Sequence, residues 1–184
     1  MLSILIPSRL EPNIENFVRA VEYIIEPNQI VIYNDRYTMG KGFALREALK
    51  EATGDKIIFI DGDWDIQPYE INKLLPYIYQ YDVVVGCKSL PKRWDRKLLT
   101  ICSRLWIRLL FGLMIDTQTG LKAFNYKPEW KTNGFAFDIE ILYKAKKEGR
   151  SIIGVPVIAE PSGRKGVKEI WSTLMETLRI RFQS

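Results

Sequence analysis

The octapeptide KIIFIDGD (residues 56–63) consists of one lysine, four β-branched or aromatic residues, and two aspartates separated by one glycine. Its apolar run is typical of a strand that is buried on both faces of a sheet. Such strands occur in parallel sheets that are covered by helices on both sides. The octapeptide therefore predicts a central strand of an α/β fold, with Asp61 and Asp63 at the carboxyl end of that strand.

Segments on both sides of this strand continue an alternation of strands and helices. Short β-branched runs predict strands over residues 2–8, 29–35 and 82–86, and apolar residues at helical spacing predict helices over 13–25, 42–52 and 69–80. Beyond residue 92 we expect an amphipathic helical segment (93–111), a strand (121–124), a helix (137–148), a strand (151–158), a loop (160–166) and a final helix (168–182). This alternation predicts a mostly parallel central sheet flanked by helices.

The composition is that of one globular domain. The chain has 184 residues, of which 47% are hydrophobic and 27% are charged, and this balance excludes a disordered chain. A net charge of +5 favours anionic partners such as phosphates, nucleotides, acidic lipid headgroups or nucleic acid. Histidine is absent, so a general base must be a carboxylate, Lys, Tyr or Cys, and a metal must be bound through oxygen ligands.

Neither a signal peptide nor a membrane-spanning segment is predicted. Pro7 and Arg9 interrupt the first apolar run, and no run reaches the roughly 18 apolar residues of a spanning helix. Cys87 and Cys102 belong to no paired motif, which favours a reduced, cytoplasmic setting. If the protein contacts a membrane, we expect it to lie on the cytoplasmic face as a peripheral protein.

Polar residues follow four of the predicted strands. They are Ser8 with Arg9, Asn34 with Asp35, the run Asp61–Asp63, and Lys88. Ligands of open α/β sheets bind beyond the carboxyl ends of the strands. We therefore expect the functional site where these four strand ends meet.

The acidic run after residue 60 is the sharpest of these signals. Asp61 and Asp63 can turn toward one cation, Gly62 allows the backbone to approach a ligand closely, and Asp65 is near enough to join them. Carboxylate oxygens suit Mg²⁺ or Mn²⁺, and such an ion commonly bridges to the oxygens of a diphosphate. The alternative is a solvated acidic turn, but three acids after a buried strand in a basic protein favour a cation site.

Two further features suit a nucleotide. Asp35 can accept hydrogen bonds from a nucleobase or ribose, or it can simply close a turn after Asn34. Gly40, Lys41 and Gly42 open a predicted helix, and a helix N-terminus with a lysine suits phosphate. This motif is too short to be a Walker loop.

Taken in order, these motifs resemble those of the family 2 glycosyltransferases of the GT-A fold, most closely the dolichyl-phosphate mannose and glucose synthases. In the first half the matching motifs are ILIP (4–7) with Glu11, Asp35, GKGxA (40–44), IIFIDGD (57–63) and DVVVG (82–86) with Lys88. In the second half they are DTQTGLKAF (116–124), FDIE (137–140) and VPV (155–157). An ordered set of this kind is far less expected by chance than any single motif.

The resemblance implies a binding site for each of three ligands. A nucleotide sugar would be bound by Pro7, Arg9, Glu11, Asp35, Lys41, Asp61, Gly62, Asp63, Arg164 and Lys165. The metal would be bound by Asp61, Asp63 and Asp65, and the acceptor by Lys88, Arg104, Gln118 and Asp138.

The catalytic residues that the resemblance implies are Asp63 and Asp138. Asp138 would orient the acceptor, or act as the base if the acceptor is an alcohol. The alternative for Asp138 and its neighbour Glu140 is that both carboxylates stabilise a helix N-terminus.

The same resemblance implies a reaction, which is the inverting, Mg²⁺- or Mn²⁺-dependent transfer of a hexose from GDP-mannose or UDP-glucose to a polyprenyl or dolichyl phosphate. We expect a single GT-A catalytic domain over residues 1–184, in which residues 1–92 bind the nucleotide and residues 93–184 contact the acceptor. The chain departs from the family in two places. Only four residues lie between Asp35 and Gly40, and Arg164 with Lys165 stands where the family has G-x-S-K.

Residues 93–111 and 168–182 predict two amphipathic helices. In the first, the side chains that share one face are Arg93, Lys97, Arg104 and Arg108, beside an apolar surface with Trp106. In the second, they are Ile170, Trp171, Leu174, Leu178 and Phe182. A basic stripe beside an apolar, Trp-bearing surface suits a lipid headgroup layer. The alternative is that both helices pack on the core or on a second subunit of a homodimer.

Two other functions stay open on the sequence alone, namely a sugar nucleotidyltransferase and a non-catalytic nucleotide- or lipid-binding module. Nucleotidyltransferases carry a Gly-rich basic loop after the first strand, whereas here no glycine precedes Gly40. The basic charge permits nucleic acid as a partner, but no recognition motif supports it, so none is expected.

Overall fold

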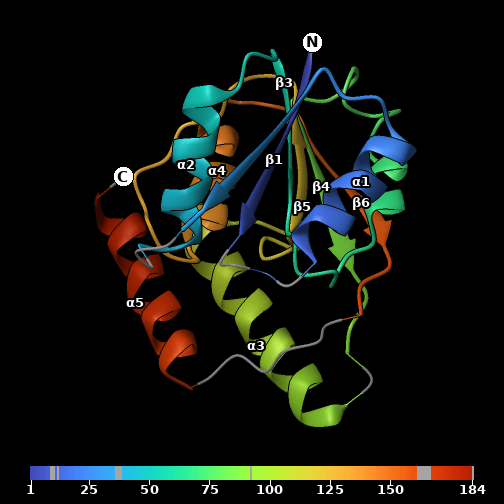
Figure 1. Ribbon diagram of the computed structural model, residues 1–184. Coiled ribbons are helices and arrows are strands. Elements are labelled where there is room, and N and C mark those ends of the chain that lie inside the picture. The colour runs from blue at the N-terminus through green and yellow to red at the C-terminus, as the bar shows by residue number, and fades with distance from the viewer. Residues whose placement is uncertain (9–10, 12, 36–38, 92, 161–166, 184) are drawn as a thin grey trace.

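A six-stranded sheet runs through the centre of the computed structural model (Figure 1), which describes every residue except 9–10, 12, 36–38, 92, 161–166 and 184, and only the backbone of 167–170 and 183. The strands are β1 (Leu2–Ser8), β2 (Gln29–Asn34), β3 (Lys56–Ile60), β4 (Val83–Lys88), β5 (Leu121–Phe124) and β6 (Ile152–Val157). Their order in the sheet is β2-β1-β3-β5-β4-β6. Since only β5 runs antiparallel to its neighbours, the prediction of a mostly parallel sheet is confirmed.

Alternation of side chains along the strands divides the core between two layers of helices. On β1, Ile4 and Ile6 belong to the cluster that packs under α1 (Ile14–Ile24) and the 3₁₀ helix η1 (Pro68–Lys73). Leu5, between them, belongs to the cluster under α2 (Lys41–Glu51) and α4 (Phe137–Lys147), which lie on the opposite side of the sheet in Figure 1. β3 alternates in the same way, with Ile57 and Phe59 in the second cluster and Ile58 and Ile60 in the first, so the octapeptide is held from both faces. Each such side chain contributes about 1.5–3 kcal/mol when fully buried.

The helix predicted over residues 69–80 forms only in part, as a 3₁₀ helix over Pro68–Lys73. The chain forms η1 and then a series of turns, in which hydrogen bonds run from Leu74 N to Ile71 O (2.9 Å) and from Tyr77 N to Leu74 O (3.0 Å). Pro76 has no N–H group to donate, and a proline disrupts the preceding α-helical turn. The aliphatic residues Ile71, Leu74 and Ile78 of this segment are nevertheless buried, so their packing was predicted although the helix type was not.

The two amphipathic helices, α3 (Trp94–Phe111) and α5 (Val167–Gln183), lie together at one end of the molecule (Figure 1). The indole N–H of Trp106 donates a 3.1 Å hydrogen bond to the hydroxyl of Thr177, which joins the two helices. Ile107 and Phe111 reach the core, whereas the first half of α3 is mostly exposed. In the part of the chain that the structure describes, no helix is both long and apolar enough to cross a bilayer.

Candidate active site

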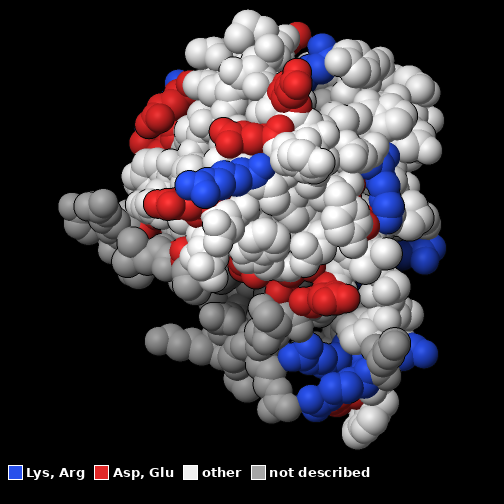
Figure 2. All heavy atoms as spheres, turned by 45° about the vertical axis from the view of Figure 1, so that its right-hand side comes forward, with Lys and Arg blue, Asp and Glu red and all other residues white. Residues whose placement is uncertain are grey.

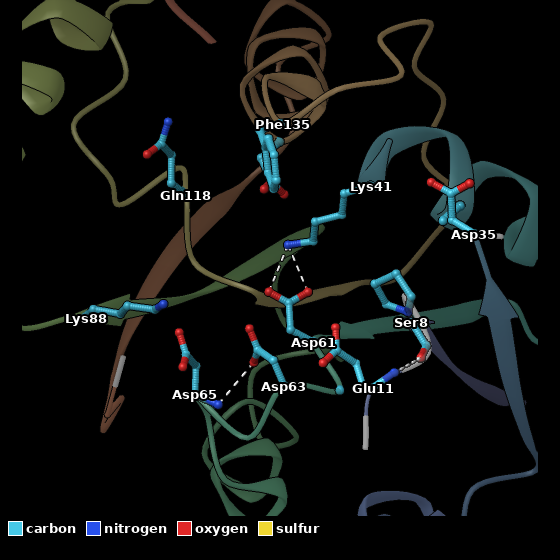
Figure 3. A pocket seen from close by; sticks show the side chains of 14 residues that line it. Ser8, Glu11, Asp35, Lys41, Asp61, Asp63, Asp65, Lys88, Gln118 and Phe135 are labelled. Atoms are coloured by element: carbon cyan, nitrogen blue, oxygen red, sulfur yellow. Dashed lines mark hydrogen bonds and ion pairs between the residues drawn. The ribbon is translucent and has the colours of Figure 1, made fainter. Parts of the chain in front are cut away.

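A pocket of about 310 Å³ opens at the carboxyl ends of the parallel strands. Its described lining residues are Pro7, Ser8, Glu11, Asp35, Lys41, Ala44, Asp61, Gly62, Asp63, Asp65, Lys88, Gln118, Phe135 and Asp138 (Figure 3). Residues at all four predicted strand ends therefore meet in one place. Arg9, Arg164 and Lys165, which we also expect at the nucleotide sugar, lie outside the described residues.

Asp61 continues β3 into the pocket and is paired there with a lysine. Lys41 Nζ lies 2.8 Å from Asp61 Oδ1 and 2.9 Å from Asp61 Oδ2 (Figure 3). The backbone N–H of Asp61 donates a 3.2 Å bond to the carbonyl oxygen of Gly120, which precedes β5. A Cβ atom on Gly120 would lie 2.0 Å from Asp61 Oδ2, so the glycine leaves the space that this carboxylate occupies.

Asp63 and Asp65 follow in a tight turn through Trp64, whose φ of 62° is left-handed. The N–H of Asp65 donates a 3.0 Å bond to Asp63 Oδ1, and Figure 3 shows both carboxylates beside that of Asp61. Desolvation of the Asp63 carboxyl and the negative charge of Asp61 raise the pKa of Asp63 above its ordinary value. The turn thus places two further carboxylates beside the Asp61–Lys41 pair.

This donor set fits a hard divalent cation. The lining carboxylates supply the oxygen ligands that Mg²⁺ and Mn²⁺ accept, and such an ion would relieve the repulsion between Asp61 and Asp63. Among the described residues, however, no three acidic, histidine or cysteine side chains stand close enough together to hold an ion as they are. Ligation by Asp61, Asp63 and Asp65 together therefore stays a prediction.

The segment that carries Lys41 is held by Asp35. The two oxygens of the Asp35 carboxylate accept bonds from Met39 N (3.0 Å) and Gly40 N (2.8 Å), and Asp35 is 5% exposed. Gly40, with φ of 117°, then leads into α2 at Lys41. The turn role that we considered as the alternative for Asp35 is thus present, and its contact with a base or ribose stays a prediction.

Lys122, which holds the lining residue Asp138, is a residue that the sequence did not predict at the site. Its Nζ donates a 2.6 Å bond to Asp138 Oδ1 and a second bond to Thr119 O, and only 1% of the residue is exposed. Burial lowers the pKa of Lys122 below its ordinary value although the Asp138 charge acts in the other direction. A lysine inside the predicted strand 121–124 was the available signal, because lysine is almost never fully buried without a partner.

Lys41 contrasts with Lys122. Burial opposes its charged form, but the negative charges of Asp61 and Asp138 outweigh this cost, so the pKa of Lys41 is raised. The pocket therefore holds Lys41 as a cation.

The acceptor residues that we expected divide into two groups. Lys88, Gln118 and Asp138 line the pocket, whereas Arg104 does not appear in the described lining. Arg104 lies behind it, where its guanidinium donates to Asp116 Oδ2 (3.0 Å) and to the Lys88 carbonyl oxygen (3.0 Å). The ion pair with Asp116 draws Arg104 toward the backbone of Lys88, so the structure gives it a supporting position.

Glu140 lies outside the pocket lining and supports the loop before α4. Its carboxylate accepts bonds from Lys131 N (2.9 Å) and Thr132 N (2.8 Å). Glu176 of α5 accepts another from Ala136 N (3.0 Å), beside the lining residue Phe135. These two glutamates hold the chain that leads into Asp138. Glu140 lies in the first turn of α4, as the alternative supposed, but its hydrogen bonds go to the loop before that helix.

The sheet order and the acidic turn after β3 identify the chain as a protein of the GT-A fold. The described fold resembles the crystal structure of glucosyl-3-phosphoglycerate synthase from Mycobacterium tuberculosis in complex with Mn²⁺ and UDP-glucose, with a TM-score of 0.78 and 15% identity over 98% of this chain and 78% of that chain. The complex of that enzyme with Mn²⁺, UDP-glucose and phosphoglyceric acid has a TM-score of 0.76 and 14% identity over 100% of this chain and 79% of that chain. The expected GT-A fold is confirmed.

Residues 9–134 match the family described as glycosyl transferase family 2, and the chain belongs to that family. Two curated relatives agree. Glycosyltransferase AglD from Haloferax volcanii is 28% identical over 75% of this chain and 24% of its own length. Undecaprenyl-phosphate mannosyltransferase from Micrococcus luteus is 23% identical over 56% of this chain and 48% of its own length. The matched part thus covers less than half of each relative.

Proposed function

We propose that the protein transfers a hexose from a nucleoside diphosphate sugar, GDP-mannose or UDP-glucose, to a polyprenyl or dolichyl phosphate, with inversion and with Mg²⁺ or Mn²⁺. The observation that carries this proposal is the single pocket in which Asp61, Asp63, Asp65 and Lys41 meet. Membership of glycosyl transferase family 2 supports the reaction type. Residues 1–92 would supply most donor contacts, and residues 93–184 the acceptor contacts.

The donor side of the pocket suits a metal-bound diphosphate. The M. tuberculosis synthase whose fold is similar has been crystallised with Mn²⁺ and UDP-glucose. In this chain Asp61 and Asp63, joined by Asp65, would hold the ion, which supplies positive charge against the leaving diphosphate. Lys41, at the first residue of α2, would add its own charge and the favourable end of the helix dipole.

The transfer forms a bond between an acceptor oxygen and the anomeric carbon while the bond from that carbon to the diphosphate breaks. The electron pair leaves with the diphosphate. A phosphate acceptor has a second pKa of about 6 and is already ionised near neutral pH, so it needs no strong base. Asp138, held by Lys122, would then orient the acceptor, and positioning with charge stabilisation would supply most of the rate.

The lipid acceptor is supported by the exposed surface of α3. Trp94 is 78% exposed and Leu109 74%, and the further exposed apolar side chains of this helix are Leu98, Leu99, Ile101 and Leu105. Basic residues flank them, and Figure 2 shows Lys and Arg gathered at the lower end of the molecule, where Figure 1 places α3. Apolar and basic side chains together suit an anionic lipid surface.

The same helix contacts the backbone of a residue that lines the pocket. Arg104 of α3 contacts the Lys88 carbonyl oxygen, so the surface and the acceptor end of the site are joined by one hydrogen bond. The M. luteus relative acts on undecaprenyl phosphate by its name, which supports a lipid phosphate here. The free cysteines Cys87 and Cys102 support a location on the cytoplasmic face.

One assay tests the donor and the acceptor. The purified chain is incubated with Mn²⁺ and radiolabelled GDP-mannose or UDP-glucose, in vesicles with or without a short polyprenyl phosphate. We expect label in the organic extract only when the lipid phosphate is present, and none for Asp63→Asn. Label that appears only on phosphoglyceric acid, or a product formed only from sugar 1-phosphate and NTP, would contradict the proposal.

Vesicle sedimentation tests the membrane contact. Trp94→Ser with Leu98→Ser is expected to lower binding to anionic vesicles by about tenfold or more, because each buried side chain contributes about 1.5–3 kcal/mol. Tyr23→Ser on α1 is the matched control, since Tyr23 is 92% exposed and belongs to a different helix. Equal binding by all three proteins, or dimers lost in the α3 variant, would favour the subunit interface instead.

A further inference from the structure

Lys41 occupies the place on Asp61 that a metal ion would need. Its Nζ bridges both oxygens of the Asp61 carboxylate at 2.8 and 2.9 Å, and the two side chains are 17% and 24% exposed (Figure 3). Mg²⁺ binds carboxylate oxygen at about 2.0–2.1 Å, so an ion on Asp61 would lie at most about 5 Å from the ammonium nitrogen. At this distance the like charges repel strongly in a partly buried site.

The net negative charge of the pocket explains why the Lys41 ammonium group lies beside Asp61. The described lining residues include the carboxylates of Glu11, Asp35, Asp61, Asp63, Asp65 and Asp138 but only the ammonium groups of Lys41 and Lys88. Lys41 therefore neutralises part of a strongly acidic site. The carboxylates themselves are not arranged around an ion, since no three acidic, histidine or cysteine side chains among the described residues stand close enough together to hold one.

The ammonium group of Lys41 can move from the Asp61 carboxylate to a bound phosphate. A lysine carries its charge on a flexible stem with rotatable bonds. The backbone of Lys41 is fixed by contrast, since the carboxylate of Asp35 holds Gly40 directly before it. From this anchored position at the N-terminus of α2, the ammonium can exchange a carboxylate for a phosphate without moving the helix.

We infer that Lys41 is a resident counter-ion of Asp61, which a divalent metal must displace and which the diphosphate of the donor draws away. The inference rests on the proposed function, because it concerns the same site. Metal alone then competes with Lys41 for Asp61, whereas metal and nucleoside diphosphate bind together. Lys41 is in this respect a positioning residue whose presence weakens the binding of free metal.

The experiment measures Mn²⁺ binding to the whole chain by electron paramagnetic resonance, with and without UDP or GDP. For the wild type we expect weak binding of Mn²⁺ alone and a gain of about tenfold or more with one of the two nucleotides. In Lys41→Met we expect Mn²⁺ alone to bind about tenfold or more tightly than in the wild type, since a neighbouring charge shifts the proton affinity of a carboxylate by a similar factor. In this variant, adding nucleotide should increase the Mn²⁺ affinity by less than it does in the wild type.

Two control variants separate charge from general effects. Lys41→Arg keeps the charge and should bind Mn²⁺ as the wild type does. Lys50→Met removes a charge from the same helix at a position that is 66% exposed and paired with Glu47, and it should also change nothing. Circular dichroism checks the fold, and Lys41→Gln provides the same readout should Lys41→Met fail to fold.

The outcomes distinguish this inference from the proposed function. If Lys41→Met and Lys41→Gln bind Mn²⁺ alone no better than the wild type, while nucleotide still strengthens binding in the wild type, the counter-ion role is refuted and the proposed function stands. If the wild type binds no Mn²⁺ with either nucleotide and transfers no sugar, the proposed function fails. The inference is supported if Lys41→Met and Lys41→Gln bind Mn²⁺ without nucleotide more tightly than the wild type and Lys41→Arg do.

Discussion

Two lysine–aspartate pairs border the same pocket and differ in how firmly they are held. Lys41 reaches Asp61 from α2 and its side chain is 17% exposed, whereas Lys122 reaches Asp138 from β5 and is 1% exposed. Burial lowers the pKa of Lys122, but at Lys41 the surrounding carboxylates outweigh burial and raise the pKa. The comparison indicates that Lys41 is a replaceable counter-charge and Lys122 a fixed part of the scaffold.

The largest expected effect is on stability, at the fixed pair. Lys122→Met leaves Asp138 buried without its cation, and breaking one side of a buried pair costs about 3–5 kcal/mol. Chemical denaturation should show this loss in the free energy of unfolding and a clearly smaller loss in Lys41→Met. The double variant Lys122→Met with Asp138→Asn should recover part of it. Equal losses in the two lysine variants would end the distinction between the pairs.

The next effect is on turnover, at the replaceable pair. Asp61→Asn removes the charge that is shared between Lys41 and the metal, and we expect kcat for sugar transfer to fall by about 10²–10³-fold, the cost typical of losing one preorganised electrostatic contact. Glu22→Gln, an exposed acid on α1, is the matched control. Activity within a few-fold of the wild type would mean that the metal is not anchored at Asp61.

A smaller effect is expected from a methyl group placed against Asp61. In Gly120→Ala the new Cβ would lie 2.0 Å from Asp61 Oδ2, so the carboxylate must shift while the Lys122–Asp138 pair stays in place. We expect donor turnover to fall by about tenfold, in the range that misplacement of one catalytic group produces. Gly149→Ala, where a Cβ meets no atom within 4 Å, tests backbone strain alone and should leave turnover unchanged.

The smallest effect concerns Asp63 and pH. Because the pKa of Asp63 is raised above 3.8 in the folded protein, the folded state holds this proton more tightly than the unfolded chain does. The stability that Asp63 contributes therefore falls as the pH rises from its ordinary pKa through the raised one. Asp63→Asn should raise Tm at pH 7, because it removes a carboxylate whose charge is partly desolvated in the folded state. The gain in the free energy of unfolding should stay below about 1 kcal/mol, since more than a third of the residue's surface is accessible to solvent, and it should vanish below pH ~4. A lower Tm at pH 7 would contradict the direction of this shift.

Much of the site was predictable because strand ends in an α/β sheet converge. The polar residues at the ends of β1, β2, β3 and β4 were each visible in the sequence, and the parallel register brings them to one edge. The acidic turn needed no further information, since Asp61, Asp63 and Asp65 are neighbours in the chain.

What was missed depends on partners that lie far apart in the sequence. Lys122 pairs with Asp138 only because β5 is inserted antiparallel between β3 and β4. Arg104 was expected at the acceptor, but its ion pair with Asp116 places it behind Lys88. The helix predicted over 69–80 ends at Lys73 for a local reason, because the apolar spacing took no account of Pro76.

The sequence by itself determined the class of fold and the chemical character of the pocket, since apolar periodicity and the position of a carboxylate after a strand are local properties. Only the tertiary structure decided which lysine neutralises which aspartate. Charge pairing inside a protein depends on burial and on distances of a few ångströms between distant segments, and neither can be read from the order of residues along the chain.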